Sequence, residues 1–585
     1  MSKKVAELTK IMEPEAEAAW VSRLWDRFNN QRRGWIEEKK ELRDYLFATD
    51  TSTTSNQSLP WKNSTTLPKL TQIRDNLHSN YLSALFPNDS WLRWEGYSDK
   101  DNTKKKAEAI ESYMANKTRE GGFRASNSRF LYDFIDYGNV FGMPIYEERA
   151  KEGVDGDKVP AYIGPNALRI SPLDIVFDPL AASFDKTWKI VRSVKSLGEL
   201  LEMSQAEPDN AAWASTVARR EEIRKRAGTW TKEDFDKAVG FSADGFGTMQ
   251  EYMLGDQVEI LEFYGDFHNS ETSTFEKDQV ITVIDRSFVA RHEAIPGWLG
   301  GTPIYHVGWR LRPDNLWAMG PLDNLVGMQY RIDHLENLKA DAQDLVVHPP
   351  LKIIGEVEEF VWGPGAEIHI DENGDVVPLS NNLSGVINAA NEIQLLEARM
   401  EQYAGAPREA MGIRSPGEKT AFEVQQLQNA AGRIFQEKIT MYETEFFEKM
   451  LNGMLEMSRR NMDTSEIVRV LDNDLSVQAL LEVTKDDITA SGVLRPIGAR
   501  HFAAQAQLFQ NLIGVFNSPL GNIIAPDVSR KAVTSMVEDV LGLERFSLFK
   551  SNIAVFEQQE TQRIQARAQE ESDLALQTNT EEELS

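Results

Sequence analysis

Hydrophobic residues recur at three- and four-residue steps in several stretches of the N-terminal part of the chain. Residues 20–47 have this spacing among charged residues. Residues 67–86, which precede Pro87, and residues 104–120 have it as well. Because one face of an α-helix repeats every 3.6 residues, this pattern predicts amphipathic helices in all three stretches.

Between residues 162 and 310 the pattern changes to short runs of β-branched and aromatic residues. VEILEFYGDF at 258–267 and VITVIDRSFVARHE at 280–293 are examples. Such runs favour strands. We therefore expect an α+β fold that is mostly helical, in which residues 1–318 combine a helical part with a β-rich part.

The order helix, small β module, helix is predicted in the middle of the chain. The helical spacing of residues 319–345 predicts a helix of about 40 Å at about 1.5 Å per residue, which ends before Pro349. Asn373 and Gly374 stand between EIHI and VVPL, a strong signal for a two-residue β-hairpin turn. Residues 388–404 are helical again, so two helices can run side by side with the β module at their far end.

The C-terminal third begins with a loop rich in glycine and proline at residues 405–419. An unusually long amphipathic helix is predicted for residues 420–457, and a β-like segment follows at 488–496. Residues 516–570 are predicted to be helical. Residues 571–585 are rich in Gln, Glu and Thr and are predicted to be disordered.

Composition limits the possible classes of protein. A chain of 585 residues exceeds the size of a single hydrophobic core, so two or more domains are expected. The absence of cysteine excludes disulfide scaffolds, thiolate metal sites and cysteine nucleophiles. No signal peptide and no membrane-spanning stretch is recognised, so a soluble protein that does not bind membranes is expected.

The net charge of −27 disfavours tight binding to nucleic acid, because affinity for phosphates comes from lysine and arginine. The negative charge is compatible with a channel wall along which DNA slides without adhering, since like charges repel.

One segment resembles a phosphate-binding loop but departs from the pattern. GIRSPGEKT at residues 412–420 has Glu418 inserted before Lys419, and Pro416 removes a backbone donor. We interpret it as a helix-entry loop. No histidine pair has the spacing of a zinc site and no catalytic motif is found, so we expect no enzyme activity, metal or cofactor.

Acidic residues cluster on the two helices predicted on either side of the β module. They are either ordinary solvated helix faces or, in a ring, the lining of a central channel where like charges keep DNA from adhering. The candidate channel residues are Asp333, Glu336, Asp341, Asp344, Glu392, Glu397 and Glu401.

Several segments, taken in order, resemble the portal proteins of tailed bacteriophages, especially the head-to-tail connectors of short-tailed phages. The segments are WKNSTTLPKL (61–70), GWRLRPDNLWAMGPL (308–322), PPLK (349–352) and GAPREAMGIRSPGEKTAFEV (405–424). No single motif is diagnostic, but the order of the segments is hard to obtain by chance, and the similarity extends over most of residues 20–515.

The resemblance implies a subunit of a ring, usually of twelve copies, with wing, stem, clip and crown regions around an axial channel. It assigns the regions as follows: wing 1–318 and 420–515, stem helices 319–345 and 388–404, clip 346–387 with its hairpin at Asn373 and Gly374, tunnel loop 405–419, and crown 516–570. The cations of the tunnel loop nearest the DNA would be Arg408, Arg414 and Lys419.

The function that the resemblance implies is a channel at one capsid vertex for packaging and ejection of the viral genome. The expected partners are further copies of the chain, double-stranded DNA, the terminase large subunit, a tail adaptor, and the major capsid and scaffold proteins. The expected location is the virion, with the host cytoplasm during assembly. A tail adaptor or scaffold protein and, as a weaker alternative, a nucleotide-processing enzyme remain open.

Overall fold

The computed structural model describes residues 15–48, 50–54, 61–86, 91–98, 100–101, 103–152, 158–226, 257–269, 273–347, 349–355, 374–378, 384–405, 434–462, 465–472 and 477–496. The described part is mixed α+β, and none of its sheets closes into a barrel. The chain divides into two compact units. The first comprises Met1–Leu85, Lys117–Asn461 and Val493–Pro496, and the second Phe86–Asn116, Met462–Gly492 and Ile497–Ser585.

The helix predicted over residues 20–47 is divided in two in the first unit. Helix α2 spans Ala16–Gln31 and α3 spans Arg33–Phe47. Arg32 separates them with φ −94° and ψ 9°. Its guanidinium donates to the carbonyl oxygens of Pro172 (2.6 Å) and Leu173 (2.5 Å), and these bonds hold the break in place.

A five-stranded antiparallel sheet lies in the first unit, in the order β4–β5–β6–β7–β8. The strands are β4 (Ile175–Phe177), β5 (Lys189–Ser196), β6 (Gln257–Asn269), β7 (Thr274–Ile284) and β8 (Phe288–Ala294). Side chains of β6 alternate between two cores, as the pleat requires. Leu261 and Phe263 pack with Trp25 of α2. Val258 and Ile260 pack with helices α7 (Leu197–Ala206) and α8 (Ala211–Arg226).

A second sheet of the first unit has the order β3–β2–β9, formed by β2 (Asn139–Glu152), β3 (Lys158–Ile170) and β9 (Tyr305–Gly308). A small hairpin, β10 (Arg310–Arg312) and β11 (Asn315–Met319), follows. Helices α6 (Phe123–Asp136) and α14 (Glu448–Asn461) pack against β2 and β3. Gly453 of α14 is required there, because a β-carbon would lie 2.9 Å from Pro144.

The long helix predicted over residues 420–457 is described from residue 434, and it contains a π-helical turn at Glu443–Phe447. Aromatic residues on its buried face pack on α6. The ring centroids of Phe446 and Phe130 are 5.0 Å apart, and those of Tyr442 and Phe134 are 5.2 Å apart. The predicted hydrophobic face is therefore a core face.

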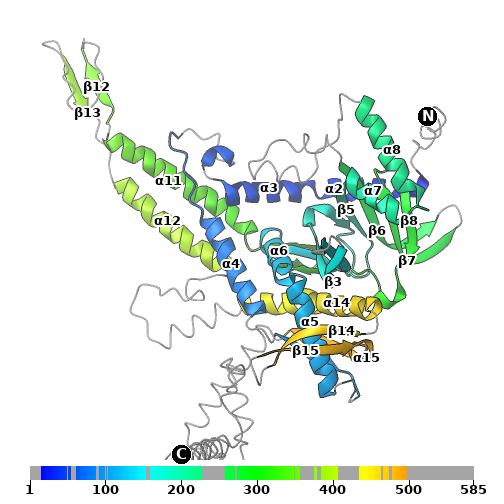
Figure 1. Cartoon of the computed structure of the whole chain (residues 1–585). Helices are drawn as coiled ribbons and strands as arrows, with labels where there is room; N and C mark the ends of the chain where they lie inside the picture. The colour runs from blue at the N-terminus through cyan, green and yellow to red at the C-terminus, as the bar shows by residue number, and fades with distance from the viewer. Residues whose placement is uncertain are drawn as a thin grey trace, which may run out of the picture. The chain divides into compact units, whose positions relative to one another are not determined.

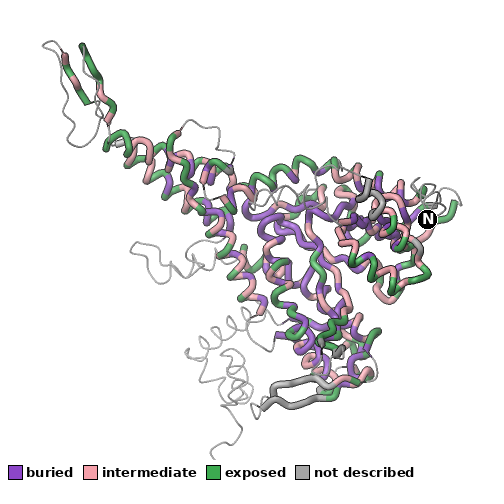
Figure 2. Tube along the Cα trace, turned by 45° about the horizontal axis from the view of Figure 1, so that its top comes forward, coloured by how far each residue is buried: buried purple, intermediate pink, exposed green. Residues whose placement is uncertain are grey.

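Two helices and a two-stranded ribbon form a projecting part of the first unit, which we call the arm (Figure 1). It consists of α11 (Val326–Val347), β12 (Leu351–Ile354), β13 (Asp375–Pro378) and α12 (Ser384–Tyr403). Helices α11 and α12 run side by side, and the ribbon lies at their far end (Figure 1). Figure 2 shows buried residues concentrated in the body of this unit and exposed ones increasing toward the tip of the arm.

The first arm helix begins later than predicted. The chain turns at Gly320 and Pro321, and a 3₁₀ turn at Asp323–Leu325 precedes α11. Asp323 Oδ2 accepts a hydrogen bond from the Gly320 backbone N–H (2.8 Å), which closes the turn. The helical spacing of residues 319–325 therefore belongs to this turn.

The remaining helices and strands are short or lie near the unit boundaries. They are 3₁₀ turns at Thr51–Thr53, Pro172–Asp174 and Gly297–Leu299, helices α4 (Lys69–Leu85), α5 (Lys104–Glu120) and α15 (Lys485–Ile488), and strands β1 (Leu92–Gly96), β14 (Ser465–Asp472), β15 (Val477–Thr484) and β16 (Gly492–Pro496). In the second unit β14 and β15 form an antiparallel hairpin. None of the described helices has the length and apolar character needed to cross a membrane.

Candidate functional site: the arm and its polar strap

The arm is the structural counterpart of the predicted order helix, β module, helix. Its ribbon pairs β12 with β13 in antiparallel register, from Leu351 opposite Pro378 to Ile354 opposite Asp375. Gly374 directly precedes β13. Asn373 and the predicted partner strand at residues 367–370 lie outside the described residues, so the hairpin turn at Asn373 stays a prediction.

The root of the arm is fixed by buried charges. Lys39 of α3 forms an ion pair with Asp323 and donates to the Asp136 carbonyl oxygen (3.2 Å). Arg74 of α4 binds the Asp136 carboxylate with two hydrogen bonds of 2.7 and 2.8 Å. Burial lowers the pKa of Lys39, and its ion pair with Asp323 opposes that effect. The turn before α11 is thus joined directly to α3, and Asp136 of α6 links the same lysine to Arg74 of α4.

A second buried ion pair fixes the other arm helix. Lys69 Nζ lies 2.6 Å from Glu401 Oε1, and the two side chains are only 5% and 6% exposed. Lys69 begins α4 and Glu401 lies in the last turn of α12. Because removal of one partner of a buried pair leaves an uncompensated charge, this contact strongly favours one position of α12 relative to α4.

An extended segment, residues 61–68, runs along α11, and we call it the strap. Polar residues of α11 recur every four positions along one face: Gln329, Asp333, Asn337 and Asp341. Two residues of an extended chain span about 6.6 Å and four residues of a helix about 6 Å, so alternate strap residues can meet successive members of this series.

The lower part of the strap is held by Gln329 and Asp333. The Leu67 N–H donates to Asp333 Oδ1 (3.0 Å), and Gln329 Nε2 donates to the Leu67 carbonyl oxygen (2.5 Å). Gln329 Oε1 also accepts from the Leu70 N–H (3.2 Å) at the start of α4. The backbone of Leu67 therefore has both its donor and its acceptor satisfied by α11.

The upper part of the strap is held by Asn337, Asp341 and Asp344. Asn337 Oδ1 accepts from the Thr65 N–H (2.8 Å), and its Nδ2 donates to the Thr65 carbonyl oxygen (2.9 Å). Asp341 accepts from the backbone N–H groups of Lys62 and Asn63, each at 3.0 Å, and from Asn63 Nδ2 at 2.6 Å. Asn63 Nδ2 also donates to Asp344 Oδ2 (3.1 Å). Side chains of α11 thus replace the neighbouring strand that an extended segment usually needs.

Asp333 is the one member of the series whose ionisation is strongly perturbed. Asp333 is fully buried, and its Oδ2 atom has no hydrogen-bond partner in the described part of the structure. Burial raises its pKa to about 7, against the opposing hydrogen bonds from Leu67 and Gln329. Burial also acts to raise the pKa of Asp341, but the N–H groups of Lys62 and Asn63 outweigh it and lower that pKa.

All the acidic residues predicted to line a channel lie on α11 or α12, but most of them already have partners in the same subunit. Asp333 is enclosed beneath the strap and Glu401 is buried against Lys69, so the prediction that these two line a channel is corrected. Asp341 and Asp344 bind the strap, Glu336 pairs with Lys339, Glu392 pairs with Arg331 at 3.2 Å, and Glu397 is half-buried. Channel lining by the exposed members stays a prediction.

The strap was missed from the sequence, where residues 49–66 look like an ordinary polar loop. The signal in the sequence is the polar series on α11, which recurs every four residues. The tunnel-loop cations Arg408, Arg414 and Lys419 lie outside the described residues, as do the predicted crown at 516–570 and the tail at 571–585.

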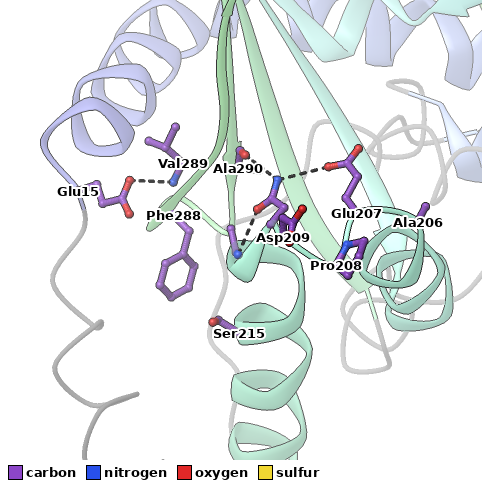
Figure 3. Close-up of a pocket in the computed structure, with 11 residues that line it drawn as sticks. Glu15, Ala206, Glu207, Pro208, Asp209, Ser215, Phe288, Val289 and Ala290 are labelled. Carbon is purple, nitrogen blue, oxygen red and sulfur yellow. Dashed lines mark hydrogen bonds between the residues drawn. The ribbon is translucent and has the colours of Figure 1, made fainter.

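A large hollow lies elsewhere in the first unit, between the start of α2, the start of β8 and the turn joining α7 to α8 (Figure 3). Its volume is about 850 Å³. Glu15 accepts from the Val289 N–H (3.1 Å), and Asn210 donates to the Ala290 carbonyl oxygen (2.8 Å). These side chains cover the open edge of β8, which protects the sheet from pairing with another strand. Among the described residues, no group of three acidic or histidine side chains is placed to hold a metal ion.

No protein-family model matches this chain, and comparison with curated proteins finds no significant relative.

Proposed function

We propose that this chain is the subunit of a phage portal ring, the channel through which the genome enters and leaves the capsid. In this proposal the arms of neighbouring subunits stand side by side as the stem, with the ribbon as the clip. The resemblance of the ordered sequence segments supports the proposal, and so does the arm itself.

The observation that carries the proposal is the set of large apolar side chains exposed on the arm. Val347 on α11 is 71% exposed and Ile387 on α12 is 62% exposed. The others are Leu338, Leu345, Val346, Ile353, Ile354, Val377, Leu395 and Tyr403. Exposed apolar patches on soluble proteins often mark interaction sites, so this concentration of apolar side chains suits the arm to packing against another protein surface.

The occupant that fits this surface best is another copy of the arm. Exposed apolar residues lie on both helices, so α11 of one subunit can pack against α12 of the next. Such a head-to-tail contact closes into a ring when a whole number of rotations from one subunit to the next makes a full turn. The buried pairs at the root keep the angle of the arm constant, and a closed ring needs one constant angle.

The net charge of −27 fits a passage for DNA better than a binding surface for it.

The terminase large subunit and a tail adaptor would bind at the ribbon end of the arm. Major capsid and scaffold proteins would contact the body. The protein would function in the virion after assembly in the host cytoplasm.

Cross-linking between subunits tests this proposal, because the chain has no cysteine of its own. Two single variants, Val347→Cys and Ile387→Cys, are mixed before assembly and then oxidised. We expect disulfide-linked heterodimers well in excess of either homodimer, since α11 of one subunit would face α12 of the next. A control mixture of Leu180→Cys, which is 77% exposed on the body, with Ile387→Cys should not cross-link.

Absence of heterodimers, or equal yields from the control mixture, would contradict the ring. A tail adaptor or scaffold would give either a monomer or a contact that does not involve both arm helices. A nucleotide-processing enzyme would bind nucleotide in a manner sensitive to Lys419→Ala.

A further inference from the structure

A small aromatic pocket lies in the body of the first unit, away from the arm surface that carries the proposed function. Its volume is about 200 Å³. Its aromatic walls are Phe28, Trp35, Phe177 and Trp317. The ring centroids of Trp35 and Trp317 are 4.7 Å apart, and those of Trp317 and Phe177 are also 4.7 Å apart in a stacked arrangement.

The size of this pocket corresponds to one aromatic ring. An apolar protein cavity of about 150 Å³ is known to bind benzene. A pocket of about 200 Å³ can therefore hold a six-membered ring with a short substituent. Aromatic walls favour a planar aromatic ligand over a branched aliphatic one, because pairs of rings gain from offset-stacked or edge-to-face contacts.

The polar groups of the pocket favour an acidic ligand. Arg312 of β10 lines it and is exposed, and no carboxylate in the described part of the chain pairs with it. Arg32 also lines it, with its guanidinium 5.4 Å from the Trp317 ring. The two amide side chains in the lining, Gln31 and Asn315, carry no charge. The charges of the lining side chains are thus positive.

We propose that this pocket binds a planar aromatic ring that carries a carboxylate. The ligand is either a free aromatic acid or an aromatic residue next to an acidic residue in a partner protein. Both sources place the ring against the wall formed by Trp35 and Trp317 and the carboxylate at Arg312. The inference does not depend on the proposed function, because none of these residues belongs to the arm.

Gly34 offers a clean way to close the pocket. It lines the pocket within α3, and a β-carbon built on it meets nothing within 4 Å. The backbone therefore accepts a β-carbon here. We expect the larger side chain of Gly34→Leu to obstruct the rim of the pocket, while Gly34→Ala adds only one methyl group. Alanine and leucine both favour the helical conformation over glycine by up to about 1 kcal/mol, so neither replacement should unfold α3. Loss of binding in Gly34→Leu would therefore not result from unfolding.

The test is ¹⁹F NMR of 4-fluorophenylacetate with the full-length protein, in which a bound probe gives a broadened signal. We expect broadening with the unmodified protein and with Gly34→Ala, and none with Gly34→Leu. Arg312→Gln should weaken binding of the acid by roughly tenfold, the equivalent of one charge-assisted hydrogen bond, while Arg310→Gln should not. Arg310 stacks on Trp309, 5.1 Å from its ring, and does not line the pocket.

Two comparisons decide the outcome. The probe 4-fluorobenzylamine, which has the opposite charge, should bind more weakly than the acid. No broadening with the unmodified protein, equal binding to Gly34→Leu, or equal binding of the amine would overturn the proposal. A blocked peptide with 4-fluorophenylalanine followed by glutamate identifies the source: tighter binding than the free acid indicates a partner protein, and weaker binding indicates a small molecule.

Discussion

Asn337 and Thr65 exchange two hydrogen bonds, with the side-chain amide of Asn337 donating to and accepting from the Thr65 backbone at 2.9 and 2.8 Å. The geometry copies that of paired peptide groups in a sheet. It lies at the centre of the polar series that attaches the strap to α11. Because Asn337 is fully buried, no water can replace it readily.

Asn337→Leu should release the strap locally. The variant keeps a side chain of similar size but leaves the N–H and C=O groups of Thr65 without partners, at a cost of about 1–3 kcal/mol. Amide hydrogen exchange of residues 61–68 should then accelerate by roughly tenfold to a hundredfold. Gln343→Leu, at an exposed position of the same helix, is the matched control and should leave that exchange unchanged.

Attachment of the strap should weaken as pH rises. Burial raises the pKa of Asp333 to about 7 from its usual 3.8, so the folded state holds this proton over a range where the unfolded chain has lost it. The stabilisation is complete below about pH 4 and is lost as pH rises through about 7. Protection of the strap, corrected for intrinsic exchange rates, should therefore fall between pH 5 and pH 8.

Two variants separate Asp333 from the other acidic residues near the strap. Asp333→Asn removes the titrating group and should abolish most of this pH dependence. Asp344→Asn changes an exposed carboxylate of the same helix and should preserve it. If both variants kept the full pH dependence, Asp333 would not be its source.

Removing one partner of the buried Lys69–Glu401 pair should cost more stability than replacing both partners. The single replacement leaves an unpaired buried charge, whereas the double replacement leaves none. Lys69→Met strands a buried carboxylate and should destabilise the first unit by about 3–5 kcal/mol. The double variant Lys69→Met with Glu401→Leu should recover most of that loss. Urea unfolding followed by tryptophan fluorescence measures both, and a double variant no more stable than Lys69→Met would refute this account.

Charges placed on the apolar surface of the arm should prevent association. Val347→Asp and Ile387→Asp put a carboxylate where a neighbouring arm would bury it, at a cost of several kcal/mol per contact. Sedimentation velocity should show subunits in place of rings for both variants. Leu180→Asp, on the body, should assemble normally, and circular dichroism should be unchanged in all three.

The sequence predicted elements whose pattern repeats locally. The strand predicted from residues 258–267 is β6, and the helix predicted from residues 104–120 is α5. Both could be predicted because burial of one face of a strand or helix imposes its own spacing on the hydrophobic residues. Helical spacing on either side of a hairpin-turn signal predicted two helices around a β module, and α11, the ribbon and α12 have that order.

Features set by distant residues were not predicted. The break at Arg32 depends on carbonyl groups of Pro172 and Leu173, which lie far away in sequence. The acidic residues of α11 look like a solvated face until the strap is placed beside them. A carboxylate that accepts backbone hydrogen bonds and one that faces water have the same sequence pattern, so only the fold distinguishes Asp333 and Asp341 from exposed residues.

The mass and symmetry of the purified full-length protein test the central claim most directly. Native mass spectrometry combined with class-averaged negative-stain images gives both. The account predicts a closed ring of about twelve subunits with an axial hole, heterologous contacts between arms and a projecting stem. A species that remains monomeric at high concentration, or a two-fold dimer with the arms apart, would contradict it.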